Sequence, residues 1–561
     1  MKMSPARTLA LFLFTVLLVP TWTSRRLSAQ DLSAQVLPAP YLHTRHTFVD
    51  RMPVSGDVLV LLVPEGISTP ALAGWSPATR DHLSRAIAAG GFTPTAGSEL
   101  EILAPVGLDF GRLILLGVGN VGSTERHRAE LIGASLSARL DGTDAKTVVV
   151  SSALLGATEA AAALTAAVAH GLDLRNYRFD RYLSNPRPRP AQAFTWHSAN
   201  PNRVEEHYRP LRALAEAVFT ARELTNLPGR IGYPKVFADF ARAVLEPLGV
   251  EVTVLGPEEV RALGMGALYS VSQGSDMGAH LLVARWRGSD GAPIALIGKG
   301  NSFDTGGYNL KTDRASILRM HTDKAGGAAV VGAVQALAAQ RAPVHVVAVV
   351  PLSINMISGD ASLPGDVVRA GDGSTIEIGS TDAEGRLILA DALWYAREHL
   401  NARVLVDIAT LTGAKMTALG NEYAALFTRD PRLEQTLRAA GRLTGERVWP
   451  MPLEGYEGIT RSRIADQINT GSPGAQAGAI FLEHFAGDTP WAHVDMAGDA
   501  FVASAQGIHP EGSTGYGVRL LTEWVWEFEG LRNRARQTTT SARVSGEEPR
   551  ELPGCCGTPD P

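Results

Sequence analysis

Two short stretches of the sequence gather acidic and basic residues in a setting rich in glycine. The first is GKGNSFDTGGYNLK at 298–311, with Asp323 shortly after it, and the second is STDAEGRL at 380–387. Together they supply four carboxylates, two lysines and one arginine: Asp304, Asp323, Asp382, Glu384, Lys299, Lys311 and Arg386. This inventory suits a pair of divalent metals with cationic groups beside them, which is the chemistry of a hydrolase.

The local sequence predicts how these groups are positioned. An apolar run, Ile294–Ile297, ends at Gly298 and predicts a buried strand, so Lys299 would lie just beyond a carboxyl end. Open α/β sheets place their ligands at that edge. Asp382, Glu384 and Arg386 are spaced at i, i+2 and i+4, which in an extended segment would turn all three to one side.

Strands and helices are predicted to alternate on both sides of a proline-rich segment. In the first half the predicted strands are Val58–Val63, Leu113–Leu116 and Val148–Val150, and the helices are Pro77–Ala89, Ser123–Leu140 and Ala157–His170. In the second half the strands are Ile294–Ile297, His345–Pro351, Val404–Ile408 and Ala492–Met496, and the helices are Lys324–Gln340 and Leu387–Leu400. Apolar strands joined by helices indicate a largely parallel sheet covered on both faces. The predicted fold class is α/β, with two domains, each a helix-flanked mixed or mostly parallel sheet, the larger C-terminal one catalytic.

Composition shifts predict the boundaries of these parts. We expect an N-terminal α/β domain at 45–185, a linker at 186–209 that begins with PRPRP, and a catalytic domain at 210–529. The tail at 530–561 is polar and rich in Pro and Gly, which predicts disorder.

The first thirty residues have the pattern of a targeting segment. Lys2 and Arg7 precede an apolar run, Leu9–Val19, and a cleavage region is offered by the small residues Ser28-Ala29. A spanning helix needs roughly 20 apolar residues, so the run is too short for one. The pattern is typical of a secretory signal peptide at 1–30 and predicts an exported, periplasmic or secreted protein. An uncleaved anchor, a mispredicted start and a cytoplasmic protein remain open.

Composition excludes some classes of protein. The chain has 561 residues, of which 45% are hydrophobic and 19% charged, with a formal net charge of −5. That is an ordinary globular composition. The acidic balance gives no support for a nucleic-acid surface. Cys555 and Cys556 are the only cysteines and are adjacent, so they cannot frame a disulfide-built fold.

Both stretches resemble the leucyl aminopeptidase family, the two-metal cytosol aminopeptidase type. That family's catalytic domain carries GKG, then FD-[ST]-GG and a lysine, then D-x-x-G and NTDAEGRL; here they read GKGNSFDTGGYNLK, DKAG and STDAEGRL. The similarity continues through ATLTGA (409–414), WAHVDMAG (491–498) and GSTGYGVRL (512–520). It covers about residues 210–527 strongly, whereas residues 45–195 match only in organisation.

The resemblance implies a role for each residue of the two stretches. Asp304 and Glu384 would bridge two metals, Lys299 and Asp323 would complete the tighter site, and Asp382 would complete the second, partly through its backbone carbonyl. Only a neutral amine can donate a lone pair, so Lys299 would have to lose its proton, which a neighbouring dication and burial favour.

Two further roles concern the reaction itself. Lys311 would stabilise the tetrahedral oxyanion, and Arg386 would hold a bicarbonate ion that shuttles a proton. The implied activity is a metal-dependent aminopeptidase that releases N-terminal, preferably Leu-like apolar, amino acids from peptides by a two-metal-activated water. Manganese or zinc is expected, with magnesium and cobalt as further options for carboxylate ligands.

Substrate contacts are expected from two more segments. The loop after a predicted strand would offer Thr410, Leu411 and Gly413 to the peptide, and Met320 matches a position that lines the first side-chain pocket in the family. Met suits an apolar pocket, although core packing explains it equally well. Lys324 departs from the family, which usually has an apolar residue after the Asp323 position. It could lie on the helix surface or weaken one metal.

Three other functions fit the sequence less well. The sequence GVGNVG at 117–122 fits a GxGxxG fingerprint, but the next strand ends at Val150-Ser151-Ser152 without the acid that a dinucleotide site needs, so we interpret it as a structural turn. A nucleic-acid-binding accessory protein of the same family would need a basic groove. A catalytically silent scaffold would not need the intact set of ligands. The partners that we expect are peptides and a homohexamer, with no nucleic acid and no stable membrane span.

Overall fold

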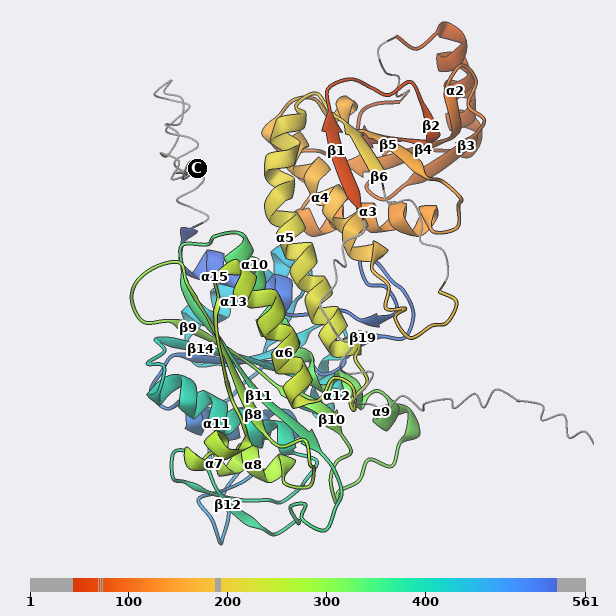
Figure 1. The fold of residues 1–561 in the computed structure, drawn as a ribbon. Helices are drawn as coiled ribbons and strands as arrows, with labels where there is room; N and C mark the ends of the chain where they lie inside the picture. Colours follow the sequence, from red (N-terminus) through yellow and green to blue (C-terminus); the bar gives the residue numbers. More distant parts are fainter. Residues whose placement is uncertain (1–43, 69, 71, 73, 187–192, 532–561) are drawn as a thin grey trace, which may run out of the picture.

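The computed structural model describes residues 44–531, except 69, 71, 73 and 187–192. Two α/β domains are joined by a long helix, α5 (Pro201–Asn226), which runs from the smaller N-terminal domain into the larger one (Figure 1). The predicted α/β fold with two domains is confirmed. The predicted signal peptide, nearly all of the predicted tail, Cys555 and Cys556 lie outside the described residues.

The N-terminal domain is built on a six-stranded sheet in the order β1-β6-β5-β2-β4-β3. All neighbouring strands are parallel except β3 and β4, which are antiparallel. The strands are β1 (Arg45–Val49), β2 (Ser55–Pro64), β3 (Glu99–Leu103), β4 (Asp109–Gly119), β5 (Thr147–Ser151) and β6 (Ala193–His197). The helices are α2 (Pro77–Gly90), α3 (Arg126–Leu140) and α4 (Glu159–Asn176), with a short 3-10 turn at Ala153–Leu155. Apolar side chains pack on both faces, α3 and α4 covering one and α2 the other.

Part of the segment expected to be a linker belongs to this sheet. Within 186–209, Ala193–His197 forms β6, which pairs in parallel with both β1 and β5. Helix α5 then begins at Pro201. The proline run masked this short strand in the sequence, because it places a strong breaker directly before it.

The GxGxxG stretch forms the turn between β4 and α3. Gly119 has φ of +69°, a value that few residues other than glycine adopt. The Asn120 side chain accepts a hydrogen bond from Gly122 N at 3.0 Å. A Cβ at Gly117 would lie 2.3 Å from the Thr95 carbonyl oxygen, so this glycine is needed for close packing. These features support the structural interpretation of the motif.

The larger domain is built on a nine-stranded mixed sheet. Its order is β16-β15-β18-β14-β9-β11-β8-β7, with β10 beside β11. The central strands β18, β14, β9 and β11 are parallel, whereas β15, β8 and β7 introduce antiparallel pairs. The strands are β7 (Glu251–Leu255), β8 (His280–Arg287), β9 (Ile294–Gly298), β10 (Gly300–Asp304), β11 (His345–Asn355), β14 (Val404–Ala409), β15 (Ala424–Thr428), β16 (Val448–Pro450) and β18 (Trp491–Asp495).

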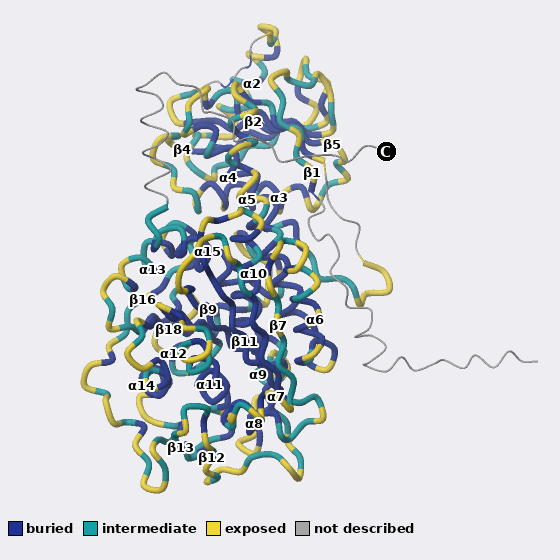
Figure 2. The backbone as a smooth tube through the Cα atoms, turned by 60° about the vertical axis from the view of Figure 1, so that its left-hand side comes forward, coloured by how far each residue is buried: buried dark blue, intermediate teal, exposed yellow. Residues whose placement is uncertain are grey.

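Helices cover both faces of this sheet, and its central strands are buried, as the dark blue segments of Figure 2 show. On one face α5 packs with α6 (Pro234–Leu245), α10 (Ala325–Ala339), α13 (Pro431–Thr444) and α15 (Val518–Phe528). On the other lie α7 (Pro257–Ala262), α8 (Gly266–Ser272), α11 (Glu384–Glu398) and α14 (Gly474–Ala486). Burial on both faces explains why these strands read as continuous apolar runs.

Smaller elements complete the domain. They are α9 (Arg314–Leu318), α12 (Gly413–Leu419), 3-10 turns at Glu246–Leu248 and Met320–Lys324, a sheet of β12 (Val367–Arg369), β13 (Thr375–Glu377) and β17 (Gln467–Ile468), and a pair of β19 (Phe501–Val502) and β20 (Gly512–Ser513). Among the described residues, no helix combines the length and apolar character needed to cross a bilayer.

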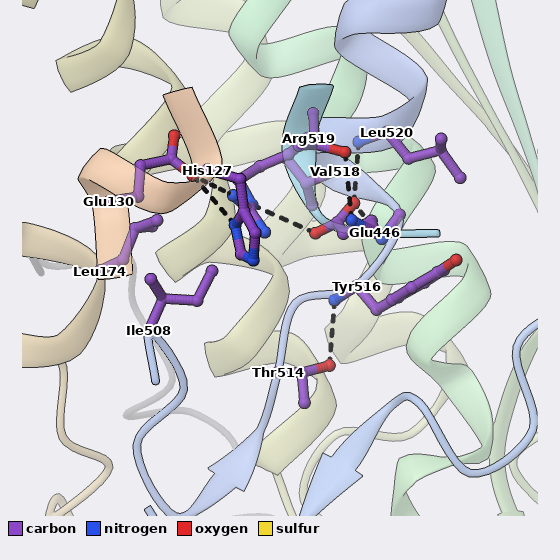
Figure 3. A network of polar contacts seen from close by, with 12 residues as sticks. His127, Glu130, Leu174, Glu446, Ile508, Thr514, Tyr516, Val518, Arg519 and Leu520 are labelled. Carbon is purple, nitrogen blue, oxygen red and sulfur yellow. Dashed lines mark hydrogen bonds and ion pairs between the residues drawn. The ribbon is translucent and has the colours of Figure 1, made fainter. Parts of the chain in front are cut away.

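A buried ionic network joins the two domains (Figure 3). Arg519 of α15 donates to Glu130 of α3 at 2.7 Å and to Glu446 at 3.3 Å. The second oxygen of Glu446 accepts from the backbone N–H groups of Gly517 and Leu520. All three charged side chains are at most 3% exposed, so these ion pairs at the domain boundary are shielded from water.

Candidate active site

The charged residues of the two sequence stretches meet at the carboxyl edge of the larger sheet. Lys299 follows directly after β9, and Asp304 is the last residue of β10. Asp323 lies in the 3-10 turn that leads into α10, and Glu384 is the first residue of α11. The structure therefore brings together groups from segments that are far apart in sequence, at the edge where α/β sheets place ligands.

Two glycines allow the strand and the helix to meet closely at this edge. A Cβ at Gly298, the last residue of β9, would lie 2.3 Å from the Gly326 carbonyl oxygen. A Cβ at Gly326, in the first turn of α10, would lie 2.2 Å from the Ile408 carbonyl oxygen. Only glycine fits at these positions, and their contact places Asp323 beside Lys299.

Lys299 lies between two carboxylates. Its Nζ is 2.7 Å from Asp323 Oδ1 and 2.8 Å from Glu384 Oε1, and it donates to the Thr410 carbonyl oxygen at 2.9 Å. The side chains of the three charged residues are at most 5% exposed.

Lys311 lies between the other two carboxylates. Its Nζ is 2.7 Å from Asp304 Oδ2 and also contacts Asp382 Oδ1. The chain reaches this position through a turn in which Gly306 and Gly307 have φ of +88° and +61°, and Lys311 N donates to the Thr305 carbonyl oxygen at 2.9 Å. Asp382 is the exposed member of the cluster, which leaves this side open to a ligand.

Crowded, buried carboxylates resist ionisation. Burial, together with the nearby charge of Glu384, raises the pKa of Asp304 to about 6. Burial likewise raises the pKa of Asp323 and of Glu384, although Lys299 opposes the shift in both cases. Additional positive charge in such a site would favour the ionised forms of these three carboxylates.

The donor set fits divalent metals. Oxygens of Asp304, Asp382 and Glu384 can all lie within 4.8 Å of one another, as a shared metal site requires. Glu384 Oε1 is buried and contacts Lys299 as an ion pair, yet within the described part of the chain it receives no hydrogen bond of proper geometry. Burial lowers the pKa of Lys299, but the carboxylates around it outweigh burial and raise it overall. A dication bound among these carboxylates would instead lower the pKa of Lys299 and favour its neutral amine.

Arg386 has the features of an anion site. Its side chain is buried, and burial lowers its pKa to about 10. Neither Nε nor Nη1 has a hydrogen-bond partner among residues 44–531 as described. Unpaired buried guanidinium groups are costly, so a small anion such as the expected bicarbonate fits here.

One local prediction is wrong. Asp382, Glu384 and Arg386 do not share an extended segment: Asp382 lies in a turn, and Glu384 and Arg386 belong to the first turn of α11. The alternation of charged residues resembled a strand, but helix α11 starts inside it. Asp382 contacts Lys311 and Glu384 contacts Lys299, with their carboxylates near each other, whereas Arg386 lies buried and takes no part in either ion pair.

The residues expected to contact substrate lie in two places. Thr410 is part of the cluster itself, since its hydroxyl donates to Asp323 Oδ1 at 2.7 Å. Leu411 is half-buried beside it, and Gly413 is exposed at the start of α12. Met320 is half-buried at the start of the turn that carries Asp323. Their contact with a peptide stays a prediction.

Lys324 does not lie on the helix surface. It is fully buried, and its Nζ donates to the carbonyl oxygens of Leu227 at 2.8 Å and His321 at 2.5 Å. Burial lowers its pKa to about 7. Its hydrogen bonds therefore go to backbone carbonyls, while the nearby charge of Asp323 opposes the lowering of its pKa.

Sequence reasoning missed two asparagines that hold the carboxylates. Asn301 donates to Asp323 Oδ2 at 2.9 Å. Asn355, the last residue of β11, donates to Asp304 Oδ1 at 2.8 Å and to the Thr381 carbonyl oxygen at 3.0 Å. Asn301 lies inside the first stretch and could have been singled out there, whereas Asn355 is the last residue of an apolar strand without any motif around it.

Family models match both domains. Residues 219–522 match the catalytic domain of the cytosol aminopeptidase family, and residues 59–186 match the N-terminal domain of the same family.

Relatives of similar length support this match. A probable cytosol aminopeptidase 1 of Shewanella oneidensis is 43% identical over 483 residues, which cover 85% of this chain and 95% of the relative. A probable cytosol aminopeptidase of Caulobacter vibrioides is 40% identical over 494 residues, covering 86% and 99%.

Solved structures agree in fold. The bottromycin maturation enzyme BotP, also solved in complex with Mn, is 32% identical, with a TM-score of 0.72 over 84% of this chain and 99% of that one. Because the matches span both domains and nearly the whole length of these relatives, the chain belongs to the cytosol aminopeptidase family and is a metal-dependent aminopeptidase, a hydrolase of peptides.

Proposed function

We propose that this aminopeptidase uses two divalent metals, held by Lys299, Asp304, Asp323, Asp382 and Glu384, to release N-terminal amino acids from peptides. The observation that carries the proposal is the gathering of four carboxylates and two lysines at one sheet edge, with buried ion pairs of 2.7–2.8 Å. Two lysines offset only part of the charge of four carboxylates, and two divalent metals would supply the rest. Manganese is the first candidate, since the related BotP has been solved with Mn, and zinc, magnesium and cobalt are alternatives.

The metals would acidify a water and polarise the scissile carbonyl. Asp304 contacts Lys311 and Glu384 contacts Lys299, and both carboxylates would be shared between the two ions. Lys299 would have to be neutral to act as a ligand, whereas Lys311, next to the exposed Asp382, would keep its proton and donate to the developing oxyanion. Arg386 would hold bicarbonate through Nε and Nη1, which have no hydrogen-bond partner among the described residues, and the group would supply proton transfer when bound there.

Preference for Leu-like residues is the finer part of the proposal. Met320 and Leu411 are half-buried apolar side chains next to the cluster in sequence, and Gly413 leaves open space at the start of α12. A flexible thioether and a leucine would line a pocket for an unbranched or γ-branched side chain.

Hydrolysis of aminoacyl-arylamides tests these proposals. Protein stripped of metal and verified metal-free should be inactive, and added Mn or Zn should restore cleavage, fastest for Leu and Met derivatives. Full activity of verified metal-free protein would refute the metal site. Restored activity without preference for apolar residues would refute only the proposed pocket.

We also propose a homohexamer whose shared interior admits short peptides and excludes folded proteins. Closed symmetry is common among soluble enzymes, and the resemblance to the family supports this assembly. Light scattering after size exclusion is the test. A fully active species of about one chain mass would contradict it.

Export is a separate proposal, supported by the short apolar run behind Lys2 and Arg7. The relatives named above are called cytosol aminopeptidases, which favours the cytoplasmic alternative. N-terminal sequencing of protein from native cells decides between them, since retention of Met1 would exclude cleavage.

A further inference from the structure

One buried carboxylate accepts hydrogen bonds from the Thr410–Thr412 loop, which follows β14. Asp495, the last residue of β18, is fully buried. Its Oδ1 accepts hydrogen bonds from Leu411 N at 3.0 Å and from Ala497 N at 3.1 Å. Its Oδ2 accepts from the Thr412 hydroxyl at 2.6 Å. Both oxygens are therefore engaged by protein groups, and two of the three bonds go to this loop.

The opposite side of the loop contacts the proposed metal ligands. The carbonyl oxygen of Thr410 accepts from Lys299 Nζ at 2.9 Å, and the Thr410 hydroxyl donates to Asp323 Oδ1 at 2.7 Å. Lys299 and Asp323 are the two residues proposed to complete the tighter metal site. A single residue of the loop thus sets the position of both.

We infer that Asp495 is a positioning residue for the metal site: it fixes the Thr410–Thr412 loop so that Thr410 can orient Lys299 and Asp323. The inference rests on the proposed metal site. Asp495 does not act on substrate, because it is fully buried and both of its oxygens already accept hydrogen bonds.

The position requires a carboxylate rather than an amide. The Thr412 hydroxyl accepts from Lys415 N at 3.2 Å, as the N-cap of α12, and gives its only proton to Asp495. An asparagine could still accept from Leu411 N and Ala497 N, but its NH₂ group could only donate to the hydroxyl, whose own proton would then lose its acceptor. Asp495→Asn therefore changes one bond with almost no change in shape.

Metal affinity is the property to measure, by competition of Mn or Zn with a chromogenic chelator in the full-length protein. Removing an outer partner of a metal ligand commonly weakens metal binding by about 10- to 100-fold. We expect a loss in this range at the tighter site for Asp495→Asn, and a loss of about tenfold for Thr412→Val, which removes the same hydrogen bond from the other side.

Asp407→Asn is the matched control. Asp407 is also fully buried at the same sheet, one strand away on β14, but it accepts from Trp491 Nε1 at 2.7 Å and contacts His493 Nδ1 at 2.5 Å instead of the loop. It should keep the metal affinity of the wild type within about threefold, well below the loss that outer partners cause.

The outcomes separate the inference from the proposed function. Loss of affinity in Asp495→Asn and Thr412→Val, with Asp407→Asn unaffected, supports the inference. Wild-type affinity in Asp495→Asn, or an equal loss in the control, overturns it while the metal site stands. Should Asp495→Asn not fold, wild-type affinity in Thr412→Val overturns it equally. Absence of metal binding in the wild type overturns both proposals.

Discussion

Removing Arg519 should weaken the contact between the two domains more than any exposed ion pair could. Arg519 is 2% exposed and pairs with Glu130 across the domain boundary and with Glu446 within the larger domain (Figure 3). In Arg519→Met, the apolar body of the side chain is kept, but both carboxylates lose this cation. Glu130 retains Arg126 at 2.9 Å, whereas for Glu446 the described residues leave its two backbone N–H donors.

The magnitude follows from that asymmetry. Loss of one partner of a buried pair typically costs about 3–5 kcal/mol, because an uncompensated charge stays in a medium of low polarity. Burial already raises the pKa of Glu446 against the pull of Arg519, so the loss of Arg519 makes it more costly to keep this carboxylate ionised. We therefore expect Arg519→Met to lower the free energy of unfolding by about 3–5 kcal/mol at pH 7.

The assay is urea unfolding, since guanidinium would screen the ion pairs. Arg447→Met is the matched control: Arg447 is 42% exposed and pairs with Glu422, which is 75% exposed. That variant should cost at most about 1 kcal/mol. Adding Glu446→Gln to Arg519→Met should recover part of the loss, because the amide oxygen still accepts from the backbone while the stranded charge is gone. A loss below about 1 kcal/mol in Arg519→Met, or no recovery in the double variant, would refute the reasoning.

Three further outcomes are expected. Lys311→Ala should lower kcat by roughly 10²–10³ with metal content unchanged, because an oxyanion donor acts in the transition state. Asp304→Ala should instead lose metal. Equal metal loss in both variants, measured by elemental analysis, would contradict this division of roles. Burial opposes ionisation of Glu130, but Arg519 and Arg126 hold its pKa well below the usual 4.5. Its contribution to stability should therefore be complete above pH 4.5 and disappear as pH falls further. A free energy of unfolding that is constant from pH 5 to strongly acid solution would exclude this. Gly326→Ala should cost about 1–3 kcal/mol and weaken metal binding, because its Cβ would press on the Ile408 carbonyl oxygen; an unchanged variant in both measurements would show that α10 can move.

Most of the fold could be predicted from the sequence because burial leaves a clear pattern. The central strands β9, β11 and β14 are buried on both faces and appear as unbroken apolar runs. Element ends were less predictable: the predicted helix 123–140 begins at Arg126 in the structure, and the predicted helix 157–170 continues to Asn176. Strand β6 was missed because it is short and follows a proline run, so only its partners in the sheet define it.

The site residues likewise fall into those that the sequence reveals and those that it does not. Carboxylates and lysines in long motifs are visible in the sequence, and the structure gathers Lys299, Lys311 and their carboxylate partners at one edge. Their directions are not visible, because a helix start such as that of α11 depends on the surrounding packing. Neutral donors such as Asn355 are invisible for another reason: an asparagine at the end of a strand gains meaning only from the carboxylate it faces.

The arrangement of charges gives a physical reason why these particular residues are combined. Two dications would balance the four carboxylates, so each remaining positive group in the cluster has to serve an anion. In the proposed mechanism Lys311 and Arg386 would fill those roles, one beside the open Asp382 and the other buried, with N–H groups that have no hydrogen-bond partner in the described part of the chain. Lys299 is the remaining cation, and it is the one enclosed between two carboxylates and a carbonyl oxygen. These neighbours favour the protonated amine, so a dication bound among them would be needed for Lys299 to act through a lone pair. In the proposed site the loop that holds Thr410, with Asp495 behind it, would keep Lys299 oriented for that role.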